Sequence, residues 1–150
     1  MASRDPKDLH PEVAKRWQLS KAKFAADNPD LPQPFLTQTY RSPAEQDILY
    51  AQGRTKPGKI VTNAKGGQSV HNYMPSCAFD IAFKAGKVIH WEIALFKKFA
   101  TVAKSFGLEW GGDWKTFQDN PHYQAPNYTW QDAKAGKERV FESDAAETSS

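Results

Sequence analysis

Two pairs of histidine and carboxylate residues are the first candidates for chemistry. His71 precedes Asp80, and Asp119 lies three residues before His122. A catalytic zinc ion typically takes three nitrogen, oxygen or sulfur ligands from the protein and keeps one position open for water. Two neutral imidazoles and one carboxylate meet that requirement, and a second carboxylate outside the ligand set can take the proton of the attacking water. The alternative is that residues 119–121 are only a turn.

The other candidates for reactive groups have simpler explanations. His10 lies where a helix should start, which suits a capping role, and His90 lies in a strand pattern that favours a partly buried structural histidine. Cys77, the single cysteine, could be a zinc ligand or a nucleophile. Alternation along the strand points it away from Asp80, so we expect a small buried side chain.

The N-terminal half is divided by proline and glycine. Pro11 starts a helical pattern that ends at the proline-rich segment 28–34, and an alternating strand pattern follows over residues 35–40. The sequence Ser42-Pro43-Ala44-Glu45 is typical of a capping box, and it predicts a helix that stops at Gly53. Residues 54–67 are rich in Gly, Pro, Lys and Thr, which indicates a long exposed loop.

The C-terminal half continues with short elements. The sequences AFDIAF and KVIHW predict a hairpin around residues 84–86. Apolar residues at helical spacing then predict an amphipathic helix that ends at Gly107; they are Ile93, Phe96, Phe99, Ala100, Ala103 and Phe106. LEWGGDW and HYQ can supply further short strands, and the end of the chain, ESDAAETSS, is typical of a disordered acidic tail. This mixture predicts a single α+β domain.

Composition excludes several classes of protein. With 150 residues, of which 39% are hydrophobic, the chain is long enough for one domain with a core. One cysteine excludes an intrachain disulfide framework, and a net charge of +3 favours acidic partners only mildly. The N-terminus has no apolar signal-peptide region, and charges interrupt the most apolar run, so neither a signal peptide nor a membrane span is expected.

Three segments together resemble a known family. They are YRSPAEQDILYAQGRTKPGKIVTNAKGGQSVHNY, then AFDIAF, then FGLEWGGDWKTFQDNPHYQ. They are similar to the zinc peptidases of the D-alanyl-D-alanine carboxypeptidase and L-alanyl-D-glutamate endopeptidase family, which also resembles the zinc-binding domain of hedgehog signalling proteins. The resemblance covers residues 40–124. It implies a small antiparallel sheet with helices packed around it, in a hedgehog/DD-peptidase-like fold.

The resemblance also implies roles for individual residues. His71, Asp80 and His122 would bind one zinc ion, and Asp119 would act as general base and then as proton donor. Arg41 would hold substrate and stabilise the oxyanion, and Ser69 would orient the ligand loop or contact substrate. The segment between His71 and Asp80 is two residues longer than is usual in the family, so we expect the MPSC sequence to widen this turn.

These inferences predict a zinc peptidase that cleaves peptidoglycan stem peptides. The preferred interpretation is an L-alanyl-D-glutamate endopeptidase that acts as a phage endolysin, made in the host cytoplasm and reaching the wall after holin-type release. Residues 1–130 would form the catalytic domain, residues 131–150 a C-terminal extension, and the protein would be a monomer without nucleic-acid or membrane partners. A D-alanyl-D-alanine carboxypeptidase, a non-catalytic zinc-binding wall module and a basic nucleic-acid-binding protein with Lys56, Lys59 and Lys65 are the alternatives.

Overall fold

The sheet at the centre of the molecule is antiparallel and joins distant parts of the sequence. The computed structural model describes residues 2–138 and 141. The strand order is β1-β2-β5-β4, and β3 pairs with the far end of β2. The strands are β1 (Gln33–Gln38), β2 (Ala78–Ala85), β3 (Val88–His90), β4 (Glu109–Trp110) and β5 (His122–Gln124). The predicted α+β class, with a small antiparallel sheet, is confirmed.

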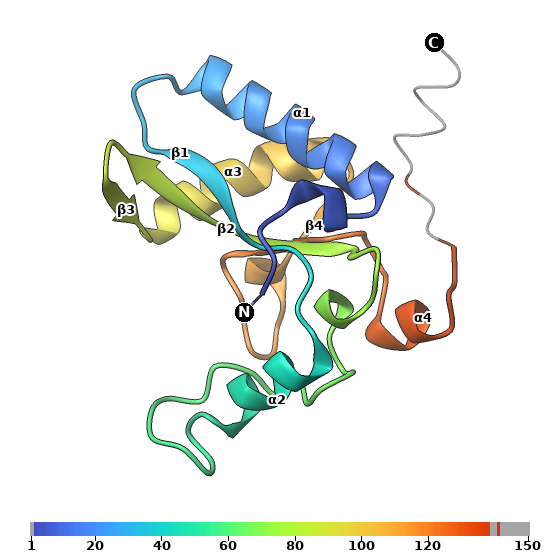
Figure 1. Ribbon diagram of the computed structural model, residues 1–150. Helices are drawn as coiled ribbons and strands as arrows, with labels where there is room; N and C mark the ends of the chain where they lie inside the picture. Colours follow the sequence, from blue (N-terminus) through green and yellow to red (C-terminus); the bar gives the residue numbers. More distant parts are fainter. Residues whose placement is uncertain (1, 139–140, 142–150) are drawn as a thin grey trace.

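Helices surround this sheet unevenly. They are α1 (Pro11–Asp27), α2 (Pro43–Ala51), α3 (Ile93–Ser105) and α4 (Trp130–Lys134), with short 3-10 helices η1 (Pro6–Asp8), η2 (Val70–Asn72) and η3 (Gly111–Asp113). Helices α1 and α3 pack against each other and cover one face of the sheet, whereas α2 and the loop after it project from the opposite side (Figure 1). No helix in residues 2–138 is both long and apolar enough to cross a bilayer.

The predicted helix starts are confirmed in atomic detail. The His10 side chain caps α1 by accepting a hydrogen bond from the backbone of Glu12, at 3.1 Å. Ser42 and Glu45 form the expected capping box of α2, in which each side chain accepts from the backbone N–H of the other. These local signals fix where α2 begins, and Arg41 therefore lies at the junction between β1 and α2.

The structure corrects one predicted strand boundary and one predicted core residue. The first strand spans residues 33–38 instead of 35–40, because Thr39 leaves the ladder and its N–H donates to the Ser3 carbonyl at 2.7 Å. The register of β1 against β2 also shifts between Leu36 and Gln38, which places Gln38 opposite Asp80. Ile93, predicted to face the core, is 54% exposed because it is the first residue of α3.

The core lies between the sheet and the helix pair α1/α3. Phe99 is fully buried there, and its ring lies 5.1 to 6.4 Å from the rings of four aromatic neighbours, which are Trp17, Phe24, Phe83 and Tyr123. Phe141, beyond the last helix, is 1% exposed, and the Arg16 guanidinium lies 3.9 Å from its ring centroid. The predicted acidic tail, residues 142–150, lies outside the described residues.

Replacing Phe99 tests how much this aromatic cluster stabilises the fold. We expect Phe99→Ala to lower the free energy of unfolding by roughly 3–5 kcal/mol, because the four neighbouring rings are held on three elements, α1, β2 and β5, and cannot refill the cavity. Equilibrium denaturation in urea measures the change. Phe117→Ala, at an exposed position, is the control and should change the free energy by less than about 0.5 kcal/mol. Equal stability of the two variants would contradict this account of the core.

Candidate metal centre

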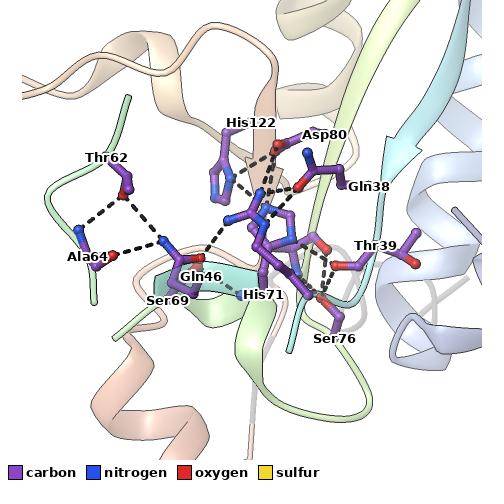
Figure 2. A network of polar contacts seen from close by, with 12 residues as sticks. Gln38, Thr39, Gln46, Thr62, Ala64, Ser69, His71, Ser76, Asp80 and His122 are labelled. Carbon is purple, nitrogen blue, oxygen red and sulfur yellow. Dashed lines mark hydrogen bonds and ion pairs between the residues drawn. The ribbon is translucent and has the colours of Figure 1, made fainter. Parts of the chain in front are cut away.

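The three predicted metal ligands meet at the junction of β2, β5 and η2. Asp80 in β2 pairs directly with His122 in β5, so strand pairing brings residues from distant segments side by side. His71 reaches them from η2, where the Ser69 hydroxyl caps the turn by accepting from the His71 backbone N–H at 3.2 Å. Figure 2 shows the two imidazole rings and the carboxylate converging on one point.

Their donor atoms form a nearly equilateral triangle. The Nε2 atom of His71 lies 3.1 Å from Oδ1 of Asp80 and 3.2 Å from Nδ1 of His122, and the last two atoms are 3.2 Å apart. Tetrahedral ligands about 2.0–2.1 Å from zinc lie about 3.3 Å from one another. The spacing of the three atoms therefore matches one face of a zinc coordination tetrahedron.

Hydrogen bonds on the far side of each ring decide which nitrogen faces this point. His71 Nδ1 donates to the Thr39 carbonyl at 2.7 Å, and His122 Nε2 donates to Oε1 of Gln124 at 2.7 Å. The Gln124 amide is itself oriented, since its Nε2 donates to the carbonyl of Tyr128 at 2.7 Å. Neither carbonyl can donate, so in neutral imidazoles the protons lie on these outer nitrogens.

The donor set consequently fits a cation. When both rings are neutral, two imidazole lone pairs and a carboxylate oxygen face one another at hydrogen-bonding distance, and no proton lies between them. Three such electron-rich atoms attract a positive ion. Burial opposes ionisation of Asp80, but the charges and hydrogen bonds of His71 and His122 hold its pKa well below the usual range. Burial also disfavours the charged form of His122, and its hydrogen bond to Asp80 outweighs this and raises its pKa. This triad is consistent with one zinc ion.

Asp119 lies beside the triad on the loop between η3 and β5. Its backbone N–H donates to the Gly111 carbonyl at 3.0 Å, and a side chain at Gly111 would place Cβ only 2.4 Å from the Asp119 carbonyl oxygen. Within residues 2–138 and 141, no hydrogen bond or ion pair engages the Asp119 carboxylate. Burial first, and then the negative charge of Asp80, raise the pKa of Asp119. The side chain is thus a carboxyl group suited to exchanging a proton.

Arg41 lies beside the Asp80 carboxylate. Its guanidinium Nη2 lies 3.6 Å from Oδ2 of Asp80, and its side chain is almost entirely buried. Nε and Nη2 both donate to Oε1 of Gln38, and Nη1 donates to Oε1 of Gln46 at 2.7 Å. The structure therefore brings Arg41, whose role was implied by the family resemblance, next to the triad and Asp119.

The lengthened link between His71 and Asp80 packs against the N-terminal segment. The Ser76 backbone exchanges hydrogen bonds with Asp8 and His10, both at 2.8 Å. Its hydroxyl lies 2.7 Å from the Ala78 carbonyl and 3.0 Å from the Thr39 carbonyl that also supports His71. The added residues thus contact η1 and the start of α1. Cys77 is buried in the hydrophobic core on the face away from the triad, so the prediction of a small buried side chain is confirmed.

A cavity of about 790 Å³ opens over the triad. Its lining includes residues 61–64 of the loop after α2, Trp114, Phe117 and residues 128–131. Ser69, Arg41 and Asp119 also line the cavity. Trp114 packs on the His122 ring at 5.0 Å, and its indole N–H donates to Glu109 at 2.9 Å. Trp110 is buried and donates to the Asn120 carbonyl, which fixes the loop that carries Asp119.

Sequence reasoning missed three glutamines of this site. Gln38 and Gln46 hold Arg41, and Gln124 orients His122. Gln124 had a usable signal, because residues two apart on a strand share a face and Gln124 follows His122 at that spacing. Gln38 had none, since its position depends on the register shift in β1.

Comparison with known proteins now adds independent evidence. Residues 62–125 match the family model described as D-alanyl-D-alanine carboxypeptidase. The chain is 41% identical over 128 residues to the peptidoglycan L-alanyl-D-glutamate endopeptidase CwlK of Bacillus subtilis, covering 79% of this chain and 74% of that protein. It is also 33% identical over 111 residues to the L-alanyl-D-glutamate peptidase of a Listeria phage, covering 71% of this chain and 40% of that protein.

Solved structures show the same fold. The L-Ala D-Glu endopeptidase ChiX of Serratia marcescens has a TM-score of 0.56 at 19% identity and covers 88% of this chain and 91% of its own. A variant of the vancomycin-resistance D,D-pentapeptidase VanY, in complex with Zn(II), has a TM-score of 0.57 at 16% identity. The match covers 85% of this chain and 76% of the VanY chain. With 41% identity over most of both chains as well as this fold and triad, the protein belongs to the M15 family of metallopeptidases, which contains D-alanyl-D-alanine carboxypeptidases and L-alanyl-D-glutamate endopeptidases.

Proposed function

We propose that this protein is a zinc-dependent endopeptidase that hydrolyses the bond between L-alanine and D-glutamate in peptidoglycan stem peptides. The observation that carries the proposal is the convergence of three metal-ligand atoms beside the carboxyl group of Asp119 in an open cavity. The choice of bond is supported by the names of the Bacillus subtilis and Listeria phage relatives, which share 41% and 33% identity with this chain.

The proposed metal ligands are His71 through Nε2, His122 through Nδ1 and Asp80 through Oδ1. Zinc, when bound, supplies Lewis acidity toward a carbonyl oxygen and makes water a stronger acid. The acceptors of the outer ring protons, Thr39 and Gln124, leave both inner imidazole nitrogens free to bind such an ion. These residues would therefore bind the metal ion and hold its ligands in the correct orientation.

Asp119 and Arg41 have separate roles, which are proton transfer and stabilisation of negative charge. Asp119 accepts the proton of the attacking water and passes it to the leaving amine. Burial and the negative charge of Asp80 raise its pKa, which makes the carboxylate a better proton acceptor. Arg41 directs its remaining N–H groups at the oxygen that gains negative charge in the transition state. Ser69 faces the same cavity and contacts the substrate or holds the η2 turn in place.

The biological setting that we infer is lysis by a phage. The similarity to a Listeria phage enzyme supports a role as an endolysin, which would reach the wall from the host cytoplasm through a holin lesion. We further propose that residues 1–130 act as a monomeric catalytic unit. A D-alanyl-D-alanine carboxypeptidase is the second candidate, because the matching family model carries that description.

Digestion of purified peptidoglycan tests the choice of bond. We expect the zinc-loaded protein to expose new N-terminal D-glutamate, identified by mass analysis of the products, and a chelator to stop the reaction until zinc is restored. Release of free D-alanine would show the carboxypeptidase instead. Absence of any product that depends on the metal would remove both activities and leave a zinc-binding module.

A further inference from the structure

Gln46 joins Arg41 to the wall of the cavity. It lies in the first turns of α2 and is only 1% exposed, although it is a polar residue on a helix that is otherwise largely open to solvent. Its amide oxygen accepts from Nη1 of Arg41 at 2.7 Å. Its amide nitrogen donates in the opposite direction, to the Ala64 carbonyl at 3.0 Å and to Thr62 Oγ1 at 3.4 Å (Figure 2).

Gln38 and Gln46 leave two N–H groups of the Arg41 guanidinium available for other partners. Arginine has five N–H donors, and three of those of Arg41 are engaged by Gln38 and Gln46. One N–H remains on each of Nη1 and Nη2, and Nη2 lies on the side of Asp80, 3.6 Å from Oδ2. The two acceptors are uncharged amides, so they fix the plane of the guanidinium without neutralising its charge.

We propose that Gln46 is a positioning residue, which aims the guanidinium of Arg41 through its amide oxygen and couples it to the cavity wall at residues 62–64 through its amide nitrogen. The inference rests on the proposed function, because it assigns Arg41 to the reaction. Contacts between a substrate and residues 62–64 would therefore affect the orientation of the Arg41 guanidinium through Gln46. The long loop after α2 would then contribute to the reaction as well as to binding.

A double-mutant cycle tests whether Gln46 acts through Arg41. We expect Gln46→Met, which keeps the side-chain length, to lower kcat on a stem-peptide substrate roughly tenfold or more, with a smaller change in KM, since hydrogen bonds to charged groups are among the stronger ones. In an Arg41→Ala background the same substitution should change kcat by less than about twofold. Multiplication of the two losses would show that Gln46 acts independently and would overturn the proposal.

Asp47→Ala is the matched control. Asp47 is the next residue of α2 and anchors the same loop, by accepting from the Gly66 backbone N–H at 2.7 Å, but the hydrogen bonds that hold Arg41 come from Gln38 and Gln46. We expect Asp47→Ala to keep kcat within about twofold of the unaltered enzyme. A loss equal to that of Gln46→Met would mean that loop anchoring alone matters, and it would also overturn the proposal.

A spectroscopic measurement separates this inference from the peptidase activity itself. In the zinc-loaded, nitrogen-15-labelled protein, the Nη1 protons of Arg41 should give slowly exchanging signals that Gln46→Met removes and that Gln46→Glu, which keeps an acceptor, retains. Loss of the signals in both variants, or in neither, would contradict the positioning role. Because no substrate is needed, this result stands even if the unaltered protein fails to cleave peptidoglycan.

Discussion

Asp119→Ala should abolish most of the peptidase activity while leaving the zinc site loaded. General acid–base groups contribute about 10²–10⁴-fold to a rate, and Asp119 is proposed to handle both proton transfers. Zinc content should stay at one ion per chain, because the carboxylate of Asp119 is not part of the triad. The measurements are kcat on peptidoglycan fragments and metal content by mass spectrometry.

The control for Asp119 lies in the same part of the chain. Asp113 forms an exposed ion pair with Lys104 at 2.6 Å, and Asp113→Ala should leave kcat nearly unchanged because this pair lies outside the triad. Asp119→Asn is the second informative variant, since it keeps the shape of the side chain and removes its ability to accept and return a proton. Activity of either Asp119 variant near that of the unaltered enzyme would refute the proposed mechanism and show that another group handles the protons.

His71→Ala should remove zinc binding and activity together. Loss of a residue that merely supports a metal ligand typically costs 10–100-fold in affinity, so loss of a ligand should cost more than about 100-fold. The remaining pair, Asp80 and His122, would supply two donors where a catalytic zinc site needs three. Competition with a fluorescent zinc chelator measures the affinity, and the same samples report the activity.

A histidine outside the site controls for nonspecific metal binding. His90 lies at the end of β3, where its Nδ1 contacts the exposed Glu92 at 3.1 Å. His90→Ala should bind zinc as tightly as the unaltered protein. If His71→Ala retained its affinity, or if His90→Ala lost it, the assignment of the triad would be wrong.

Local sequence determined the elements, because capping and turn signals act between residues close together in the chain. The capping box at Ser42 and Glu45, the hairpin after β2 and the glycine that ends α3 were all predictable in this way. The strand boundary at Thr39 was not, since its backbone is held by Ser3 and its carbonyl by the His71 ring. Contacts from distant segments decided that boundary.

The chemistry of the site was likewise predictable only in part from the sequence. The residue types of His71, Asp80, Asp119 and His122 were enough to suggest a zinc site, because ligand preference and proton transfer belong to the side chains themselves. The prediction of a zinc peptidase came from the resemblance of three sequence segments to a known family. Only the tertiary structure decided which imidazole nitrogen faces the metal position and which groups hold Arg41. Those choices depend on hydrogen-bond acceptors from other elements, namely Thr39, Gln38, Gln46 and Gln124, which only the packing of strands and loops brings within reach.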